Sequence, residues 1–201
     1  MTIKALVPIA PGTEEMEAIT IIDVLIRANY QVTVASVEPE GQLTFKGSRG
    51  IPLNADVKLV DVADDEFDVI ALPGGVDGAM VFQQSILLLE MVKQQHYDGR
   101  LNAAICATPA LMLQHHNLYP KALMTCHPSF KSHIPANNWR EKRVTYDQTY
   151  NLLTSQGPGS AFEFAIEIII HLSGKAFAWS IAEPMVPLPN LHYHNLGAKG
   201  V

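Results

Sequence analysis

The sequence predicts an α/β fold in which a mostly parallel sheet has helices on both faces. Two observations support this prediction. Short apolar runs alternate along the chain with longer segments whose apolar residues recur every three or four positions, which is the pattern of repeated strand–helix units. With 201 residues, of which 48% are hydrophobic and 17% charged, the chain is also long and apolar enough to bury a full core.

The elements expected in the first half follow in a regular order. Segments with helical spacing include the one that places Ile19, Ile22 and Leu25 on one face. Gly47 and Gly50 favour a short hairpin between two strand-like runs. In order, we expect a strand at residues 4–10, a helix at 14–28, a strand at 31–37, a hairpin at 43–53, a strand at 68–72 and a helix at 78–95.

The second half repeats the pattern and ends in a tail of different composition. Its expected elements are a strand at residues 101–106 with a helix after it, strands at 122–126, 143–146 and 152–155, and a helix at 160–172 that Gly174 closes. Glu183 and Pro184 then break the helical pattern, and two further prolines follow. We therefore expect one domain over residues 1–183 and an irregular tail over 184–201.

Composition and charge argue against several classes of function. The formal net charge is −6 and no run of Lys and Arg forms a basic stripe, so binding to nucleic acid or an anionic membrane is not expected. The apolar runs are too short to span a bilayer, and the chain enters its first strand without a signal-peptide pattern. Cys106 and Cys126 are the only cysteines and form no CxxC pair, so we expect a reducing, cytoplasmic setting.

Cys106 ends a buried strand and is followed at once by Ala107, Thr108 and Pro109. Thr108 can cap a helix whose first turn holds Pro109, which would make this corner a nucleophile elbow that pushes the cysteine side chain into a cleft. The positive end of that helix would favour a thiolate. The alternative is a buried structural cysteine, because free cysteine packs as a small apolar side chain. From this segment alone the two interpretations are balanced.

Glu17 lies in the opening turns of the first predicted helix, just after the first strand. The carboxyl ends of parallel strands gather at one edge of a sheet, which would bring Glu17 close to Cys106. A carboxyl buried beside the cysteine would have a raised pKa and could donate or exchange a proton. The alternative is an exposed, ionised acid that complements the helix dipole, as we expect for Glu14 and Glu15.

Two further strand ends supply candidate partners. Gly74 and Gly75 follow the fourth strand, and glycine permits a close approach of the backbone. The amides of Gly75 and Ala107, with Gly74 adjoining, could form an oxyanion hole beside the cysteine, although a plain turn is the alternative. His127 follows a later strand, where it could accept the thiol proton or orient a substrate, or could be a polar residue at a turn.

Metal and disulfide chemistry have less support in the sequence. His192 and His194 alternate like metal ligands, but no acid or cysteine lies at a useful spacing, so neither a metal site nor a cofactor is expected. Cys126 could resolve an oxidised Cys106 as a disulfide. Strand alternation could equally bury Cys126 on the opposite face of the sheet.

Four motifs stand in order along the chain, at residues 11–18 (PGTEEMEA), 68–75 (DVIALPGG), 103–107 (AAICA) and 153–165 (LTSQGPGSAFEFA). Together they resemble the DJ-1/ThiJ/PfpI superfamily and are most similar to its DJ-1/YajL branch. The resemblance extends from residue 5 to about residue 184. Four motifs in the same order are far more specific than any one of them.

The resemblance implies a flavodoxin-like three-layer sandwich that forms a homodimer, with Met16 and Arg27 in the dimer contact. Two related branches do not fit. The PfpI-type proteases have a histidine directly after the nucleophile, where this chain has Ala107. Class I glutamine amidotransferases need a His-x-Glu pair, which none of the eight histidines provides.

For the site, the resemblance implies that Cys106 is the reactive cysteine and that Glu17 is its protonated acid partner. His127 matches a nearby histidine, and Arg49 matches an arginine at the entrance. Gln156 stands where DJ-1 has an arginine, which would make the entrance less positive.

The implied function is that of a cofactor-independent enzyme for reactive dicarbonyls or their adducts with proteins or nucleotides. Such an enzyme would be a glyoxalase III-like lyase or a deglycase and would release a hydroxy acid. The alternative is a redox-responsive stress protein with chaperone activity, in which Cys106 is oxidised to a sulfinate that Glu17 hydrogen-bonds. Both functions need the same cysteine.

Overall fold

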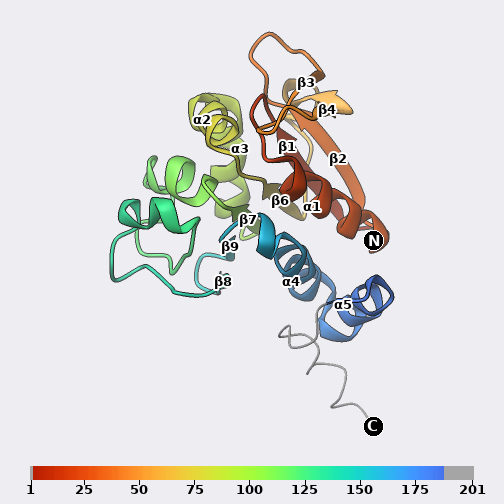
Figure 1. Cartoon of the computed structure of the whole chain (residues 1–201), viewed down its shortest axis with the longest axis vertical. Helices are drawn as coiled ribbons and strands as arrows, with labels where there is room; N and C mark the ends of the chain where they lie inside the picture. The colour runs from red at the N-terminus through yellow and green to blue at the C-terminus, as the bar shows by residue number, and fades with distance from the viewer. Residues whose placement is uncertain (1, 188–201) are drawn as a thin grey trace.

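A central sheet with helices on both sides organises the molecule, which is described here from a computed structural model over residues 2–187 (Figure 1). Within these residues the sheet has seven strands in the order β5-β2-β1-β6-β7-β9-β8. Every neighbouring pair is parallel except β8 and β9. The strands are β1 (Lys4–Ile9), β2 (Gln31–Ser36), β5 (Val57–Lys58), β6 (Val69–Leu72), β7 (Leu101–Ile105), β8 (Val144–Asp147) and β9 (Leu152–Ser155). This arrangement confirms the predicted α/β fold.

The helices form the two outer layers. Figure 1 shows α1 and α4 on one side of the sheet and α2 and α3 on the other. The helices are α1 (Glu15–Arg27), α2 (Val76–Gln84), α3 (Ile86–Tyr97), α4 (Ala161–Ser173), α5 (Lys175–Ala182), the π-helix η2 (Pro109–Gln114) and the 3₁₀ turns η1 (Leu59–Val62), η3 (Pro128–His133), η4 (Pro158–Ser160) and η5 (Glu183–Met185). A separate hairpin, β3 (Thr44–Lys46) with β4 (Pro52–Asn54), confirms the hairpin expected at 43–53.

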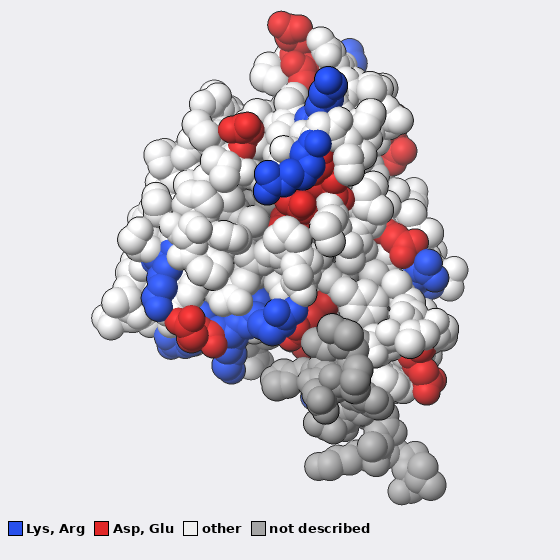
Figure 2. All heavy atoms as spheres, in the orientation of Figure 1, with Lys and Arg blue, Asp and Glu red and all other residues white. Residues whose placement is uncertain are grey.

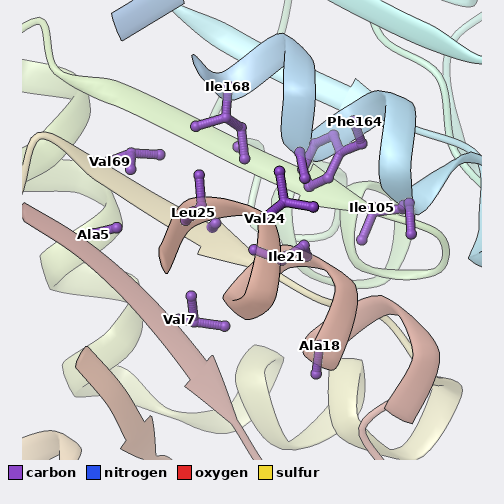
Figure 3. Close-up of a cluster of buried hydrophobic side chains, with 14 of the residues drawn as sticks. Ala5, Val7, Ala18, Ile21, Val24, Leu25, Val69, Ile105, Phe164 and Ile168 are labelled. Carbon is purple, nitrogen blue, oxygen red and sulfur yellow. The ribbon is translucent and has the colours of Figure 1, made fainter. Parts of the chain in front are cut away.

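The core lies in two layers because alternate residues of each strand point to opposite faces. Val7 of β1 belongs with Ile21 and Phe164 to one apolar cluster on the α1 and α4 side, which Figure 3 shows. The neighbouring Leu6 packs with Phe82 on the α2 and α3 side. All of these side chains are almost fully buried, so each strand contributes apolar area to both layers.

One predicted helix is in fact two. Residues 78–95 were expected to form a single helix, but α2 ends at Gln84 and α3 begins at Ile86. Ser85 between them has extended backbone angles, and its hydroxyl accepts a hydrogen bond from the amide of Leu88 at 3.3 Å. The serine is therefore the N-cap of α3, which is the role that serine favours over the interior of a helix.

The strand expected at 122–126 is not formed, apart from an isolated bridge between Met124 and Trp139. Its amides are satisfied in other ways. The N–H of Leu123 donates to the side chain of Asp147 at 2.7 Å, and the N–H of Thr125 donates to the hydroxyl of Thr154 at 2.9 Å. Because side chains take the place of a neighbouring strand, the apolar pattern alone gave the wrong element.

The end of the described chain is more helical than expected. Gly174 closes α4 with a φ of +85°, as predicted, but α5 follows at once and was missed. Beyond it η5 covers Glu183–Met185, and the rest of the expected tail from residue 188 lies outside the described residues, with His192 and His194 in it. Within residues 2–187 no helix is long and apolar enough to cross a membrane.

Candidate active site

Cys106 stands at a strained corner directly after β7. Its φ is +66°, which few residues other than glycine adopt. The corner is held from both sides, since the Cys106 N–H donates to the carbonyl of Ser155 at 2.9 Å and its own carbonyl accepts from the N–H of His127 at 2.7 Å. The π-helix η2 begins three residues later, at Pro109. The predicted nucleophile elbow therefore has the backbone geometry expected of it.

Thr108 has a different role from the one predicted. It was expected to cap the helix after the cysteine, but its own backbone is already helical and its side chain makes no capping bond. Instead the buried hydroxyl of Thr108 donates to the carbonyl of Pro73 at 2.6 Å. This bond ties the turn after β7 to the turn after β6, which holds Gly74 and Gly75.

Glu17 is fully buried and reaches the same place from α1. Its Oε2 accepts a hydrogen bond from the amide of Gly74 at 2.7 Å. A methyl group added at Gly74 would lie 2.5 Å from Cβ of Cys106 and 2.7 Å from Oε2 of Glu17. Only glycine leaves room for the carboxyl and the cysteine to approach each other, so the structure brings the two predicted residues together at this glycine.

The electrostatics of the pair differ in part from expectation. Burial raises the pKa of Glu17 to about 7, against the hydrogen bond from Gly74 and the interaction with the Cys106 thiol, which lower it. Burial, followed by the charge of Glu17, raises the pKa of Cys106 to about 12. The raised pKa of the acid was expected, whereas the raised pKa of Cys106 favours the thiol over the thiolate that was predicted. Glu17 is then divided between its two forms and can act as the base.

The amides of Gly75 and Ala107 both hydrogen-bond the Cys106 side chain, and both lower its pKa. Gly75 has a φ of +88°, and a methyl group there would collide with the carbonyl oxygen of Gly12, so glycine is needed on two counts. These are the two donors expected beside the sulfur. Gly74 was expected to adjoin them, but its amide is already used by Glu17.

A cavity of about 400 Å³ opens above the sulfur, and His127 and Arg49 both line it. Nδ1 of His127 accepts the amide N–H of Ser129 at 3.3 Å, so in the neutral ring the proton is on Nε2. The ring of His127 also meets Phe130 edge-on, with centroids 6.2 Å apart. Of the predicted site residues, Gly75 and Cys106 also line this cavity, with Cys106 8% exposed at its base, whereas Glu17, Gly74 and Ala107 lie behind its wall.

Glu15 lies in this region in an environment that its sequence position did not predict. Instead of being an exposed acid, it is 4% exposed and holds the loop that carries Arg49. Its carboxylate accepts from the amides of Arg49 at 2.7 Å and Ile51 at 3.2 Å and from the hydroxyl of Ser48 at 3.0 Å. In Figure 2, basic and acidic side chains adjoin where the β3–β4 hairpin meets the start of α1. No local sequence pattern marks a contact between segments so far apart.

Cys126 is fully buried in the apolar layer on the α2 and α3 side, whereas Cys106 belongs to the layer on the other side. Its thiol donates to the carbonyl of His127 at 3.4 Å. This placement supports the packing interpretation of Cys126 over the resolving one. Within residues 2–187 no three His, Cys, Asp or Glu side chains gather in a way that could hold a metal.

The residues matched to a dimer contact lie on the outer face of α1. Met16 is 62% exposed, with Ile19 and Ile26 also exposed on the same helix. Arg27 pairs with Asp23 at 2.7 Å. The homodimer itself stays a prediction.

Gln156, which was matched to an arginine at the entrance, is half-buried, and its backbone N–H donates to the carbonyl of Arg143 at 3.2 Å.

The sandwich fold with a cysteine and a buried carboxyl at one strand end defines the class of protein, and comparisons identify the family. The model of the DJ-1/PfpI family matches residues 3–171, and the chain belongs to this family. Protein dj-1beta of Drosophila melanogaster is 41% identical over 189 residues, which cover 92% of this chain and 98% of the relative. The Caenorhabditis elegans protein named glutathione-independent glyoxalase DJR-1.2 is 34% identical, covering 90% of this chain and 95% of the relative.

Longer relatives and solved structures agree with this assignment. Protein DJ-1 homolog B of Arabidopsis thaliana is 42% identical, although the chain spans only 42% of its length. The crystal structure of VC2308 protein superposes with a TM-score of 0.92 at 44% identity and covers all of both chains. A structure of Toxoplasma gondii DJ-1, described as oxidized, gives a TM-score of 0.88 at 40% identity over 92% of this chain and 98% of that one.

Proposed function

We propose that this protein is a cofactor-independent enzyme that converts reactive dicarbonyls, or their adducts with proteins or nucleotides, into hydroxy acids. One observation supports the proposal above all others. The buried carboxyl of Glu17, with a pKa of about 7, meets Cys106 at Gly74. The Cys106 sulfur lies under an open cavity and has two backbone amides beside it. A carboxyl poised near neutral pH can both take up and return a proton during a reaction.

The proposed reaction begins with addition of the Cys106 sulfur to an aldehyde carbon. The thiol proton passes to the Glu17 carboxylate and from there to the aldehyde oxygen, which gives a hemithioacetal and restores the carboxylate. The amides of Gly75 and Ala107 flank the sulfur, so an oxygen on the carbon bonded to sulfur falls within their reach. This step needs no thiolate in the resting enzyme, which fits the raised pKa of Cys106.

Glu17 then removes the hydrogen from the carbon bonded to sulfur and returns a proton to the neighbouring carbon. The hemithioacetal becomes a thioester of a 2-hydroxy acid, so the aldehyde carbon is oxidised and the ketone carbon is reduced. Water hydrolyses the thioester and the sulfur regains its proton. With methylglyoxal the sum is one dicarbonyl plus one water giving lactic acid, and no other reactant is required.

Lactate release from methylglyoxal tests this mechanism in the intact chain and in two variants, Cys106→Ala and Glu17→Gln. We expect release by the unchanged protein and loss in both variants, and equal rates in all three would contradict the mechanism. Pre-formed methylglyoxal adducts of arginine, offered with a scavenger of free aldehyde, distinguish action on adducts from action on the free dicarbonyl. The name of the worm relative supports the free dicarbonyl.

A second function is favoured by a different observation, the oxidized structure of the Toxoplasma gondii relative. In this alternative two equivalents of peroxide oxidise Cys106 to a sulfinate, the buried carboxyl of Glu17 hydrogen-bonds it, and the protein acts in the stress response as a chaperone. Intact-mass spectrometry after mild peroxide should show a two-oxygen adduct that Cys106→Ala lacks. Absence of that adduct would contradict the alternative. A cytoplasmic location remains a prediction for both functions.

A further inference from the structure

Charged side chains surround the cavity unevenly. Glu14, Asp77 and Arg49 all line it, and they supply two carboxylates and one guanidinium. Glu14 is 8% exposed and accepts the amide N–H of Glu17 at 2.8 Å, so its charge lies deep in the wall. Within residues 2–187 neither Asp77 nor Arg49 forms an ion pair, so both charges face the cavity and solvent without neutralisation.

Asp77 is fixed at the cavity rather than loosely near it. It is the second residue of α2, two positions after Gly75, whose amide bonds the Cys106 sulfur. A methyl group added at Gly12 would lie 2.5 Å from Cβ of Asp77, which places the start of this side chain against the Gly12 turn. The amide of Gly12 in turn donates to the carbonyl of Lys46 at 2.9 Å, on the hairpin that leads to Arg49.

Two negative charges and one positive charge therefore lie where a substrate would enter. Glu17, below the cavity, adds a further negative charge when it is ionised. We propose that Asp77 is a specificity-determining residue that makes the cavity select uncharged and cationic carbonyl compounds over anionic ones. The inference rests on the proposed function and names its substrate class: neutral dicarbonyls, and adducts that keep a positive charge. Carbonyl compounds with a carboxylate or phosphate are disfavoured.

A purely structural role for Asp77 makes a different prediction. An acid in the first turn of a helix stabilises the helix through its dipole, and Asp77 is in the first turn of α2. In that case Asp77→Asn would lower thermal stability and leave charge selectivity unchanged. The two roles can therefore be separated by a ratio of rates, which a general loss of stability does not move.

The experiment measures alkylation of Cys106 by iodoacetamide and by iodoacetate, which are similar in size and differ in charge. Intact-mass spectrometry gives both rates, with Cys106→Ala as the background. In Asp77→Asn we expect the ratio of the iodoacetate rate to the iodoacetamide rate to rise about threefold, as for one unit charge acting across a hydrated cavity. Arg49→Gln should lower the ratio. The matched control is Asp64→Asn, which removes the same charge from an exposed position that does not line the cavity.

An unchanged ratio in Asp77→Asn, or an equal rise in Asp64→Asn, would overturn this inference. Alkylation requires an accessible sulfur that can lose its proton, but no turnover of a carbonyl substrate, so the result stands whether or not the protein releases lactate. If lactate forms and the ratio does not respond to Asp77, only the selectivity fails. If the ratio responds and no lactate forms, the proposed reaction fails and the charge preference of the cavity remains.

Discussion

The two cysteines of this chain lie in similar local sequences and in different environments. Each is buried, each is followed within three residues by a proline, and burial raises the pKa of each thiol to about 12. Burial is the cause of the raised pKa of Cys126, whose side chain packs among apolar residues. Cys106 has a strained backbone, two amides on its sulfur, a carboxyl beside it and a cavity above it. Burial and thiol pKa therefore do not separate the two cysteines, whereas the groups around each sulfur do.

Replacing each cysteine with alanine should give the largest difference in activity between the two positions. We expect Cys106→Ala to lower kcat for methylglyoxal at least about a thousandfold, because the nucleophile is lost. Cys126→Ala should leave kcat within about twofold and lower the free energy of unfolding by about 1 kcal/mol, because it leaves a small void. Lactate release and urea unfolding measure both. An equal loss of activity in the two variants would remove the distinction.

Gly74 tests whether closeness of the carboxyl and the cysteine is what sets Cys106 apart. Alanine there would force Cys106 and Glu17 apart, and overpacking of this kind destabilises proteins by about 1–3 kcal/mol. We expect Gly74→Ala to lower kcat by at least about tenfold as well, since a small misplacement of reacting groups is costly. The matched control is Gly159→Ala, where an added methyl group meets nothing within 4 Å. Full activity in Gly74→Ala would show that the contact is not needed.

Glu17 provides a pH-dependent test of its burial. Its pKa is about 7 in the folded protein and has an ordinary value of 4.5. A raised folded pKa stabilises the protein fully below pH 4.5, and that contribution is lost as pH rises through 7. Relative to Glu17→Gln, the unchanged protein should therefore lose about 3 kcal/mol of unfolding free energy between pH 4.5 and pH 8. Urea unfolding at several pH values measures this difference, and parallel curves for the two proteins would contradict the burial of a titrating carboxyl.

Cys106 and Glu17 also show how much of the site the sequence could predict. Strand ends meet at one edge of a parallel sheet, so the order of elements was enough to bring Cys106, Glu17 and Gly75 together. The break at Ser85 rests on a local bond from the amide of Leu88 to the serine hydroxyl, which competes with a continuous helical pattern. The loss of the strand at 122–126 depends on bonds from its amides to side chains of distant segments, which single-segment patterns do not contain. The sequence also did not predict the raised pKa of Cys106. It depends on how deeply both groups are buried, and position along the chain does not give that depth.

Glu15 offers the smallest effect, and it tests whether the cavity above Cys106 must be held in shape from outside. Its carboxylate holds the Ser48–Ile51 loop and therefore positions Arg49, and it touches neither the sulfur nor the cavity. We expect Glu15→Gln to raise KM about threefold and to leave kcat nearly unchanged, because weaker hydrogen bonds loosen the entrance and not the reacting groups. The control is Glu38→Gln, whose carboxylate likewise receives a loop amide, from Gln42 at 2.9 Å, away from the cavity. A fall in kcat with unchanged KM would instead place Glu15 among the groups that act on the reacting atoms, and Cys106 would then differ from Cys126 in having two buried acids that serve it.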